Sequence, residues 1–214
     1  MKPTPLLLLA LLFKTPTTGP APAVRVTFSP LTKAAHLESR KLTVVTKPAL
    51  SFPVKKVRGR LVVPTAAGPK VFQDKGVGTD NDDQVQYEYL GYAAALKYHL
   101  VVSHYWEGYE CQLVGDNGQQ LALPHEPTFS PDLRSLVVYS AGIEVSYMQN
   151  TIQVYRLENG RWRQVWKLEP SVEPATWEPQ EVRWLSNSTL LLKKRMWTGK
   201  NPGAAYTYAK LTIQ

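Results

Sequence analysis

From Val24 onward, apolar residues recur at every second position rather than at every third or fourth. A period of two matches side chains on one face of a β-strand, and β-branched and aromatic residues concentrate in the same short runs. Asn-Gly pairs separate some of these runs, at Asn117-Gly118 and Asn159-Gly160. Such a pair predicts a tight hairpin turn in which both residues take positive φ. The pattern therefore predicts an all-β fold of antiparallel hairpins.

The expected strands are short runs of alternating residues bounded by turn formers. They cover Val24–Phe28, Leu42–Thr46, Arg60–Val63, Lys70–Gln73, Lys97–Ser103, Tyr109–Val114, Gln120–Leu123, Ser135–Tyr139, Ile152–Leu157, Trp162–Leu168, Val182–Trp184, Thr189–Lys194 and Ala205–Thr212. Helical spacing is scarce. Leu31–Arg40 fits two or three helical turns, while Leu90–Leu96 is ambiguous because its alanines favour a helix and its flanking tyrosines favour a strand.

Residues 1–23 have the features of a secretory signal. Lys2 gives a positive start, Leu6–Phe13 is an unbroken apolar run, and Ala21-Pro22-Ala23 offers small residues for cleavage. A buried amino-terminal helix is the alternative, but the surrounding prolines would leave it barely two turns. We expect a secreted or periplasmic protein that starts at Val24. No apolar run reaches the roughly 18 residues of a membrane-spanning helix, so we do not expect the chain to span a membrane.

Positive charge is concentrated near the amino terminus of this expected mature chain. Between Val24 and Lys75 eleven basic residues face only two acidic ones, Glu38 and Asp74. The densest group is Lys55, Lys56, Arg58 and Arg60. It suits contact with an anionic polymer, a membrane surface or an acidic protein partner, or else forms a solvated loop and strand edge. Nucleic acid is not expected as a partner, because no aromatic platform is interleaved with the cluster.

Two segments of the chain echo each other, Pro127–Val138 and Val182–Leu192. In both, an aromatic residue leads into a polar turn, and three aliphatic residues follow it. Phe129-Ser130-Pro131-Asp132, with its trailing aliphatic strand, resembles the strand-entry motif of WD-repeat-like β-propeller blades of bacterial exported proteins. The resemblance extends at most over Lys97–Gln214. Leu133 stands where that family usually has glycine, and the second segment lacks the Pro-Asp pair.

The resemblance implies blade-like sheets within one all-β domain, residues 24–214, in which the basic segment 24–75 precedes the blade-like segment 97–214. A closed propeller has about four to eight blades, and this chain holds too few strands for a comfortable ring. Three architectures stay open: an open propeller-like stack, a half-ring completed by a second copy as a homodimer, and a β-sandwich.

Motifs for the common catalytic chemistries and for cofactors are missing from the sequence. There is no Gly-x-Ser-x-Gly elbow, and Gly76-Val77-Gly78 lacks the third glycine and the helix of a phosphate-binding loop. We therefore predict no cofactor. Ser130, placed before proline in a turn, is expected to cap the backbone rather than act as a nucleophile. Cys111, the only cysteine, lies in an alternating run and is expected in the core.

An acidic loop offers the best candidate metal ligands. Asp80, Asp82 and Asp83 place carboxylates at close spacing, and oxygen ligands suit calcium. The segment does not match a helix-loop-helix calcium site, since the twelfth position from Asp80 is Gly91 rather than glutamate. A solvated loop is the alternative interpretation.

Aromatic residues with a polar group are the enrichment that best suits a binding function. Tyr105, Trp106 and Tyr109 cluster beside Glu107 and Glu110 in an expected turn. A sugar or peptide can stack on such rings while the carboxylates accept hydroxyl or amide protons. The alternative is that these rings only pack against the sheet and bind no ligand.

The leading hypothesis is a non-enzymatic exported binding or scaffold protein for an unknown protein or carbohydrate ligand. The second is a secreted carbohydrate-active hydrolase using Glu107, Glu110 or the acidic loop, which requires two carboxyl groups roughly 5 to 9 Å apart across a cleft. The third is an inhibitor- or immunity-type protein that docks an acidic partner through Lys55–Arg60.

Overall fold

The computed structural model describes residues 24–79, 82–142, 149–170, 176–197 and 205–214. Within these ranges the chain is all-β, with fifteen strands and one short helix. The predicted secretory segment and Asp80 lie outside the described residues. Nowhere in the described part of the chain is a helix long and apolar enough to cross a bilayer.

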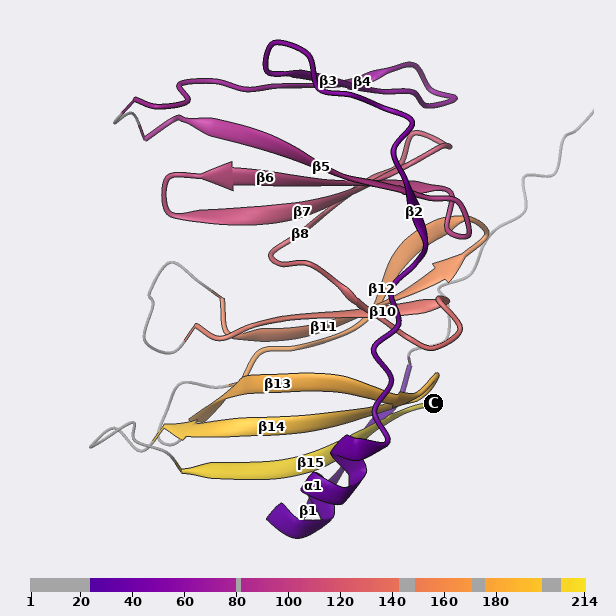
Figure 1. Ribbon diagram of the computed structural model, residues 1–214. Helices are drawn as coiled ribbons and strands as arrows, with labels where there is room; N and C mark the ends of the chain where they lie inside the picture. The colour runs from indigo at the N-terminus through magenta and orange to yellow at the C-terminus, as the bar shows by residue number, and fades with distance from the viewer. Residues whose placement is uncertain (1–23, 80–81, 143–148, 171–175, 198–204) are drawn as a thin grey trace, which may run out of the picture.

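The strands form three antiparallel sheets and a separate hairpin, stacked in an open pile that does not close on itself (Figure 1). The first sheet contains β2 (Leu50–Ser51), β5 (Val85–Ala93), β6 (Tyr98–Tyr105), β7 (Gly108–Gly115) and β8 (Gln120–Leu123). The second contains β9 (Thr128–Phe129), β10 (Ser135–Ser140), β11 (Thr151–Glu158) and β12 (Arg161–Leu168). The third contains β13 (Thr176–Ser186), β14 (Thr189–Trp197), β15 (Tyr206–Ile213) and β1 (Val26–Leu31).

One end of the stack is covered by the hairpin of β3 (Arg60–Val63) and β4 (Lys70–Gln73). Strand alternation turns Leu61, Val63 and Phe72 inward, where they pack on Val101 and Val114 of the first sheet. The remaining hairpin residues face outward and are mostly exposed. The hairpin thus buries the outer face of the first sheet.

The other end is covered by α1 (Lys33–Lys41), which lies against the third sheet. Thr32 caps the helix, because its hydroxyl accepts the Ala35 N–H at 3.1 Å. His36 is buried and stacks on the ring of Tyr208, with 4.5 Å between ring centroids. The helix expected near residues 31–40 is therefore present, and it serves as a cap.

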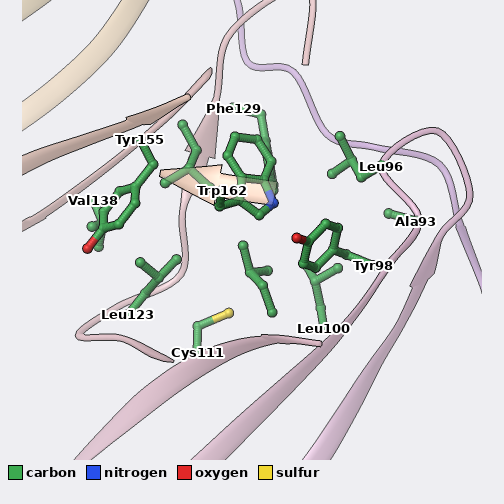
Figure 2. Close-up of a cluster of buried hydrophobic side chains, with 12 residues drawn as sticks. Ala93, Leu96, Tyr98, Leu100, Cys111, Leu123, Phe129, Val138, Tyr155 and Trp162 are labelled. Atoms are coloured by element: carbon green, nitrogen blue, oxygen red, sulfur yellow. The ribbon is translucent and has the colours of Figure 1, made fainter. Parts of the chain in front are cut away.

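Between the first and second sheets lies an aromatic core (Figure 2). Trp162 and Phe129 of the second sheet meet Tyr98 of the first, with ring centroids about 6 Å apart in each Trp162 pair. Cys111 is fully buried in this cluster, as its alternating run predicted. Burial raises the pKa of its thiol to about 12, so the thiol stays protonated and unreactive.

A second, mainly aliphatic core joins the second and third sheets. Trp184 is wholly buried there, and its indole N–H donates to the Thr128 carbonyl at 2.9 Å. β1 pairs antiparallel with β15, from Val26 opposite Ile213 onward, and so supplies the outer strand of the third sheet. Because the second sheet faces a core on both sides, the β10 residues Leu136–Val138 are all buried.

The two echoing segments touch each other through their turns. The Asp132 N–H donates to the Asn187 side-chain oxygen at 3.1 Å. Ser130 is buried and its hydroxyl bonds to the Ser135 backbone, which is the capping role expected of it. Leu133 takes φ of 60°, in the left-handed region that favours glycine. The likeness to WD-repeat-like blades remains a prediction that rests on this motif.

Several local expectations needed correction. Leu42–Thr46 is not a strand, because no other strand pairs with it along its length. It forms only an isolated bridge at Thr46. Val85–Ala93 is the long strand β5, although no strand was expected at Val85–Tyr89 and Leu90–Leu96 was ambiguous. Asn159 and Gly160 both take positive φ as predicted, but at Asn117-Gly118 only the glycine does. There Gly118 N–H bonds the Gly115 carbonyl at 2.8 Å, in a longer loop.

The chain between α1 and β3 runs along the side of the stack as a single extended segment (Figure 1). We call Leu42–Val57 the strap. The Val44 N–H donates to the Trp184 carbonyl of the third sheet at 3.0 Å, and Thr46 bridges Phe129 of the second. Further on, Leu50 and Ser51 form β2 against the end of β5 in the first sheet. The strap therefore ties together one edge of all three sheets.

Candidate binding groove

An open groove of about 880 Å³ lies where the β6–β7 hairpin meets the edge of the second sheet. We call it the aromatic groove. The hairpin wall is the run of six residues from Tyr105 to Glu110, and the facing wall comprises Ser140, Gln149, Thr151 and Gln153. Asp82, Pro124 and His125 complete the lining. The five residues predicted as a ligand-binding cluster are thus brought together on one wall.

Three aromatic rings protrude on the hairpin wall. Tyr105, Trp106 and Tyr109 are 42%, 51% and 41% exposed, whereas most other aromatic side chains of the sheets are buried or half-buried. The tight β6–β7 turn, with Tyr105 paired to Gly108, leaves Trp106 at the tip with no facing sheet to cover it. Tyr109 is held edge-on by His125, at 5.2 Å between ring centroids. These rings offer stacking surface at little cost in conformational freedom.

The tyrosine hydroxyl groups on this wall are protonated, and that of Tyr105 already donates a hydrogen bond within the protein. Burial raises the pKa of both Tyr105 and Tyr109, and nearby carboxylates reinforce the shift. The Tyr105 hydroxyl donates to Glu110 Oε2 at 3.2 Å. Glu110 is thereby oriented alongside the rings, and its remaining lone pairs can accept hydrogen bonds from a ligand.

The facing wall is a buried polar network. Thr151, Gln153 and Tyr155 alternate on one face of β11, as residues two apart must. Gln153 donates to Thr151 Oγ1 at 3.3 Å and accepts from the Tyr155 hydroxyl at 2.8 Å and the Gln164 amide at 3.0 Å. Ser140, opposite Thr151 in the β-ladder, lies 3.3 Å from its hydroxyl. The network fixes the positions of amide and hydroxyl groups on the facing wall of the groove.

Three carboxylates line the groove, those of Asp82, Glu107 and Glu110. None of them forms an ion pair among the described residues. The groove therefore has a negative character, with aromatic rings on one side and uncharged hydrogen-bonding groups on the other. An uncharged polyhydroxylated ligand matches this lining, while an anionic one would be repelled.

Of the three predicted metal ligands, the structure describes only Asp82 and Asp83. Asp80 lies outside the described residues, Asp82 lines the aromatic groove, and Asp83 forms an ion pair with Lys75. No group of three or more histidine, cysteine, aspartate or glutamate residues with metal-binding geometry is present in the described ranges. In the described part of the acidic loop, one aspartate thus lines the groove and the other forms an ion pair.

The predicted basic cluster is also divided. Lys56 turns inward, where its ammonium group donates to Asp74 and to the Tyr87 carbonyl, both at 2.7 Å. Arg58 sits in a tight turn with φ of 51° beside Gly59. Lys55, Arg58 and Arg60 are exposed and form no ion pair with any described residue. Three of the four cations therefore face solvent.

His99 and His104, five residues apart on β6, point to opposite faces of the strand. His99 is buried and its Nδ1 lies 2.8 Å from the Tyr89 hydroxyl, while His104 bonds Glu88 at 3.2 Å on the surface. Burial lowers the pKa of His99 and raises that of Tyr89 to about 12. The buried pair is thus neutral and stabilises the sheet.

Sequence reasoning missed the facing wall of the groove. Ser140, Thr151 and Gln153 looked like ordinary strand residues, because their role depends on which sheet lies beside the β6–β7 hairpin. The one available signal was the polar alternation Thr151, Gln153, Tyr155 within an otherwise aliphatic strand. No protein-family model matches the chain, and no curated protein is significantly similar to it in sequence.

Proposed function

We propose that this protein is a non-enzymatic binding protein whose aromatic groove takes an uncharged oligosaccharide. The observation that carries the proposal is the pairing of exposed Tyr105, Trp106 and Tyr109 with a facing wall of fixed amide and hydroxyl groups. Sugar rings stack their C–H faces on aromatic rings, and their hydroxyl groups both donate and accept hydrogen bonds. The three carboxylates of the groove favour an uncharged glycan over uronic or sulfated ones.

The test is a calorimetric titration with cellotetraose, maltotetraose and tetra-N-acetylchitotetraose, each compared with an oligogalacturonate of the same length. We expect at least one uncharged tetrasaccharide to bind and the oligogalacturonate not to. Trp106→Ala should weaken that binding at least tenfold, which corresponds to about 1.4 kcal/mol. Phe52→Ala is the matched control, because Phe52 is also an exposed ring, at 66% against 51% for Trp106, and lies outside the groove.

Two results would contradict the proposal: equal loss of binding in both variants, or no binding of any uncharged oligosaccharide. A peptide ligand would show itself if the groove bound acetylated tetrapeptides but not the sugars.

A hydrolase acting on the same glycan is the second candidate. It is favoured by the presence of Asp82, Glu107 and Glu110 along one groove, since glycoside hydrolysis needs a pair of carboxyl groups. The same titration samples distinguish the two functions when assayed for new reducing ends. We expect none. Release of reducing ends that disappears in Glu107→Gln or Glu110→Gln would replace the binding proposal by the hydrolase.

We also propose that the protein is exported, on the strength of the signal-like residues 1–23. Sequencing the amino terminus of protein expressed in a bacterial host with an intact secretion system tests this. We expect protein recovered from the periplasm or the medium to begin at or close to Val24. Protein retained in the cytoplasm with Met1 in place would contradict export.

A further inference from the structure

The strap carries an unusual concentration of exposed apolar side chains. Six of the fourteen large hydrophobic residues exposed in the described chain lie within it. Their exposed fractions run from 39% to 74%, for Leu42, Val44, Val45, Leu50, Phe52 and Val57. Such a concentration of exposed apolar side chains on a folded protein often marks a contact with another molecule or with a membrane.

The strap and the residues that flank it are also strongly basic. From Lys41 to Arg60 the chain has six basic residues and no acidic one. Lys41 and Lys56 are paired to Glu38 and Asp74, but Lys47, Lys55, Arg58 and Arg60 form no ion pair with any described residue. Protruding apolar side chains are therefore interspersed with free positive charges along one exposed segment.

The backbone of the strap is hydrogen-bonded to the sheets, while many of its side chains are exposed to solvent. Its bonds to the three sheets, at Val44, Thr46 and β2, hold it against the stack. Connections of this length without much secondary structure of their own are uncommon in compact domains and often functional. Because sheets stack roughly 10 Å apart, the strap covers about 20 Å of one side of the molecule between its contacts with the third and first sheets.

We propose that the strap is a membrane-binding surface that docks this protein on an anionic lipid bilayer. Side chains that are 62–74% exposed, such as Leu42, Val45 and Phe52, protrude far enough to enter the interfacial layer without the complementary hollows that a folded partner must supply. The free cations supply attraction to anionic headgroups. A second copy of the chain is disfavoured as occupant, because its own strap would bring like charges together.

This docking would leave the aromatic groove accessible. The strap pairs with β5 at Tyr92 and Ala93, and Ala93 in turn pairs with Tyr98 at the start of β6. The groove begins at Tyr105, at the other end of the same strand. Figure 1 shows the strap and the β6–β7 turn on opposite sides of the stack. The inference does not depend on the proposed glycan function, because it uses none of the groove residues.

The test is co-sedimentation of residues 24–214 with vesicles of phosphatidylcholine containing one third phosphatidylglycerol, alongside vesicles of phosphatidylcholine alone. We expect binding to the anionic vesicles at low salt and much weaker binding at about 0.5 M salt, where charges are screened within a few ångströms. Replacing Lys47, Lys55 and Arg58 together by glutamine should weaken binding about a hundredfold, since each neutralised cation costs roughly fivefold.

An apolar variant tests the other half of the surface. Leu42→Ser, Val45→Ser and Phe52→Ser combined should weaken binding about tenfold or more, because insertion scales with buried apolar area. Matched controls are Val62→Ser with Val71→Ser on the outer face of the β3–β4 hairpin, and Arg161→Gln with Arg163→Gln on β12, all exposed positions away from the strap. Near-ultraviolet circular dichroism of each variant verifies folding.

Failure of the wild-type protein to bind anionic vesicles at low salt would overturn the proposal. So would strap variants that bind as tightly as the controls. Oligosaccharide titration of the same strap variants should be unchanged, so loss of membrane binding and loss of glycan binding are separable results.

Discussion

Apolar residues are buried in one region of this molecule and exposed in another. Leu190, Leu191 and Leu192 of β14 are at most 1% exposed, whereas Leu42, Val45 and Phe52 of the strap are 62–74% exposed. The β14 residues lie within a sheet that has the second sheet on one face and α1 on the other. The strap is a single extended segment that lies over sheet edges, and no layer formed by the described residues covers it. Burial here is decided by the layer opposite a residue, not by the residue's own hydrophobicity.

The largest expected effect contrasts a buried ring with an exposed one. Trp184→Ala should destabilise the fold by about 4 kcal/mol, because it opens a large cavity and leaves the Thr128 carbonyl without its indole donor. Phe52→Ala should change the free energy of unfolding by less than about 0.5 kcal/mol. Urea denaturation followed by circular dichroism measures both. Similar losses in the two variants would mean that the strap is packed like the core.

A smaller effect tests how the strap is attached to the first sheet. Gly91 takes φ of 129°, and an added Cβ would lie 3.0 Å from both Leu50 Cβ and the Ser51 carbonyl oxygen of the strap. Gly91→Ala should therefore destabilise the protein by about 2 kcal/mol and loosen β2. Gly160→Ala is the matched control, because Gly160 also takes a positive φ, of 72°, and nothing lies within 4 Å of its Cβ position. Equal stability of the two variants, measured by urea denaturation, would show that the strap does not press on β5.

The alternation of residues predicted the fold class because most strands lie in sheets with a core on at least one side. Strands from Arg60 to Val63 and from Gln120 to Leu123 have the boundaries that the pattern predicted. β5 was missed although Val85, Tyr87 and Tyr89 alternate with polar residues, because tyrosine is only weakly apolar and the alternation stops at Leu90, where glycine and alanine weaken the strand signal. Leu42–Thr46 has a strand-like composition, but its backbone pairs with neighbouring strands only at Val44 and Thr46, and pairing is a tertiary property.

Only the aromatic wall of the candidate site could be predicted from the sequence, for a similar reason. The aromatic wall comes from one short turn, so Tyr105, Trp106 and Tyr109 are neighbours in sequence as well as in space. The facing wall comes from Ser140, Thr151 and Gln153, whose position depends on how the second sheet stacks on the first. Likewise, the basic cluster is visible in the sequence, but the inward turn of Lys56 toward Asp74 follows only from the β3–β4 hairpin.

The two exposed surfaces are assigned to different ligands, and one measurement tests that division most directly. Amide chemical shifts of the ¹⁵N-labelled protein should be recorded during titration with the tetrasaccharide that binds best. We predict shifts on both walls of the aromatic groove, at Tyr105–Glu110 and at Thr151 and Gln153, with the strap from Leu42 to Val57 unchanged. Shifts centred on the strap, or binding that leaves the groove unperturbed, would contradict the account.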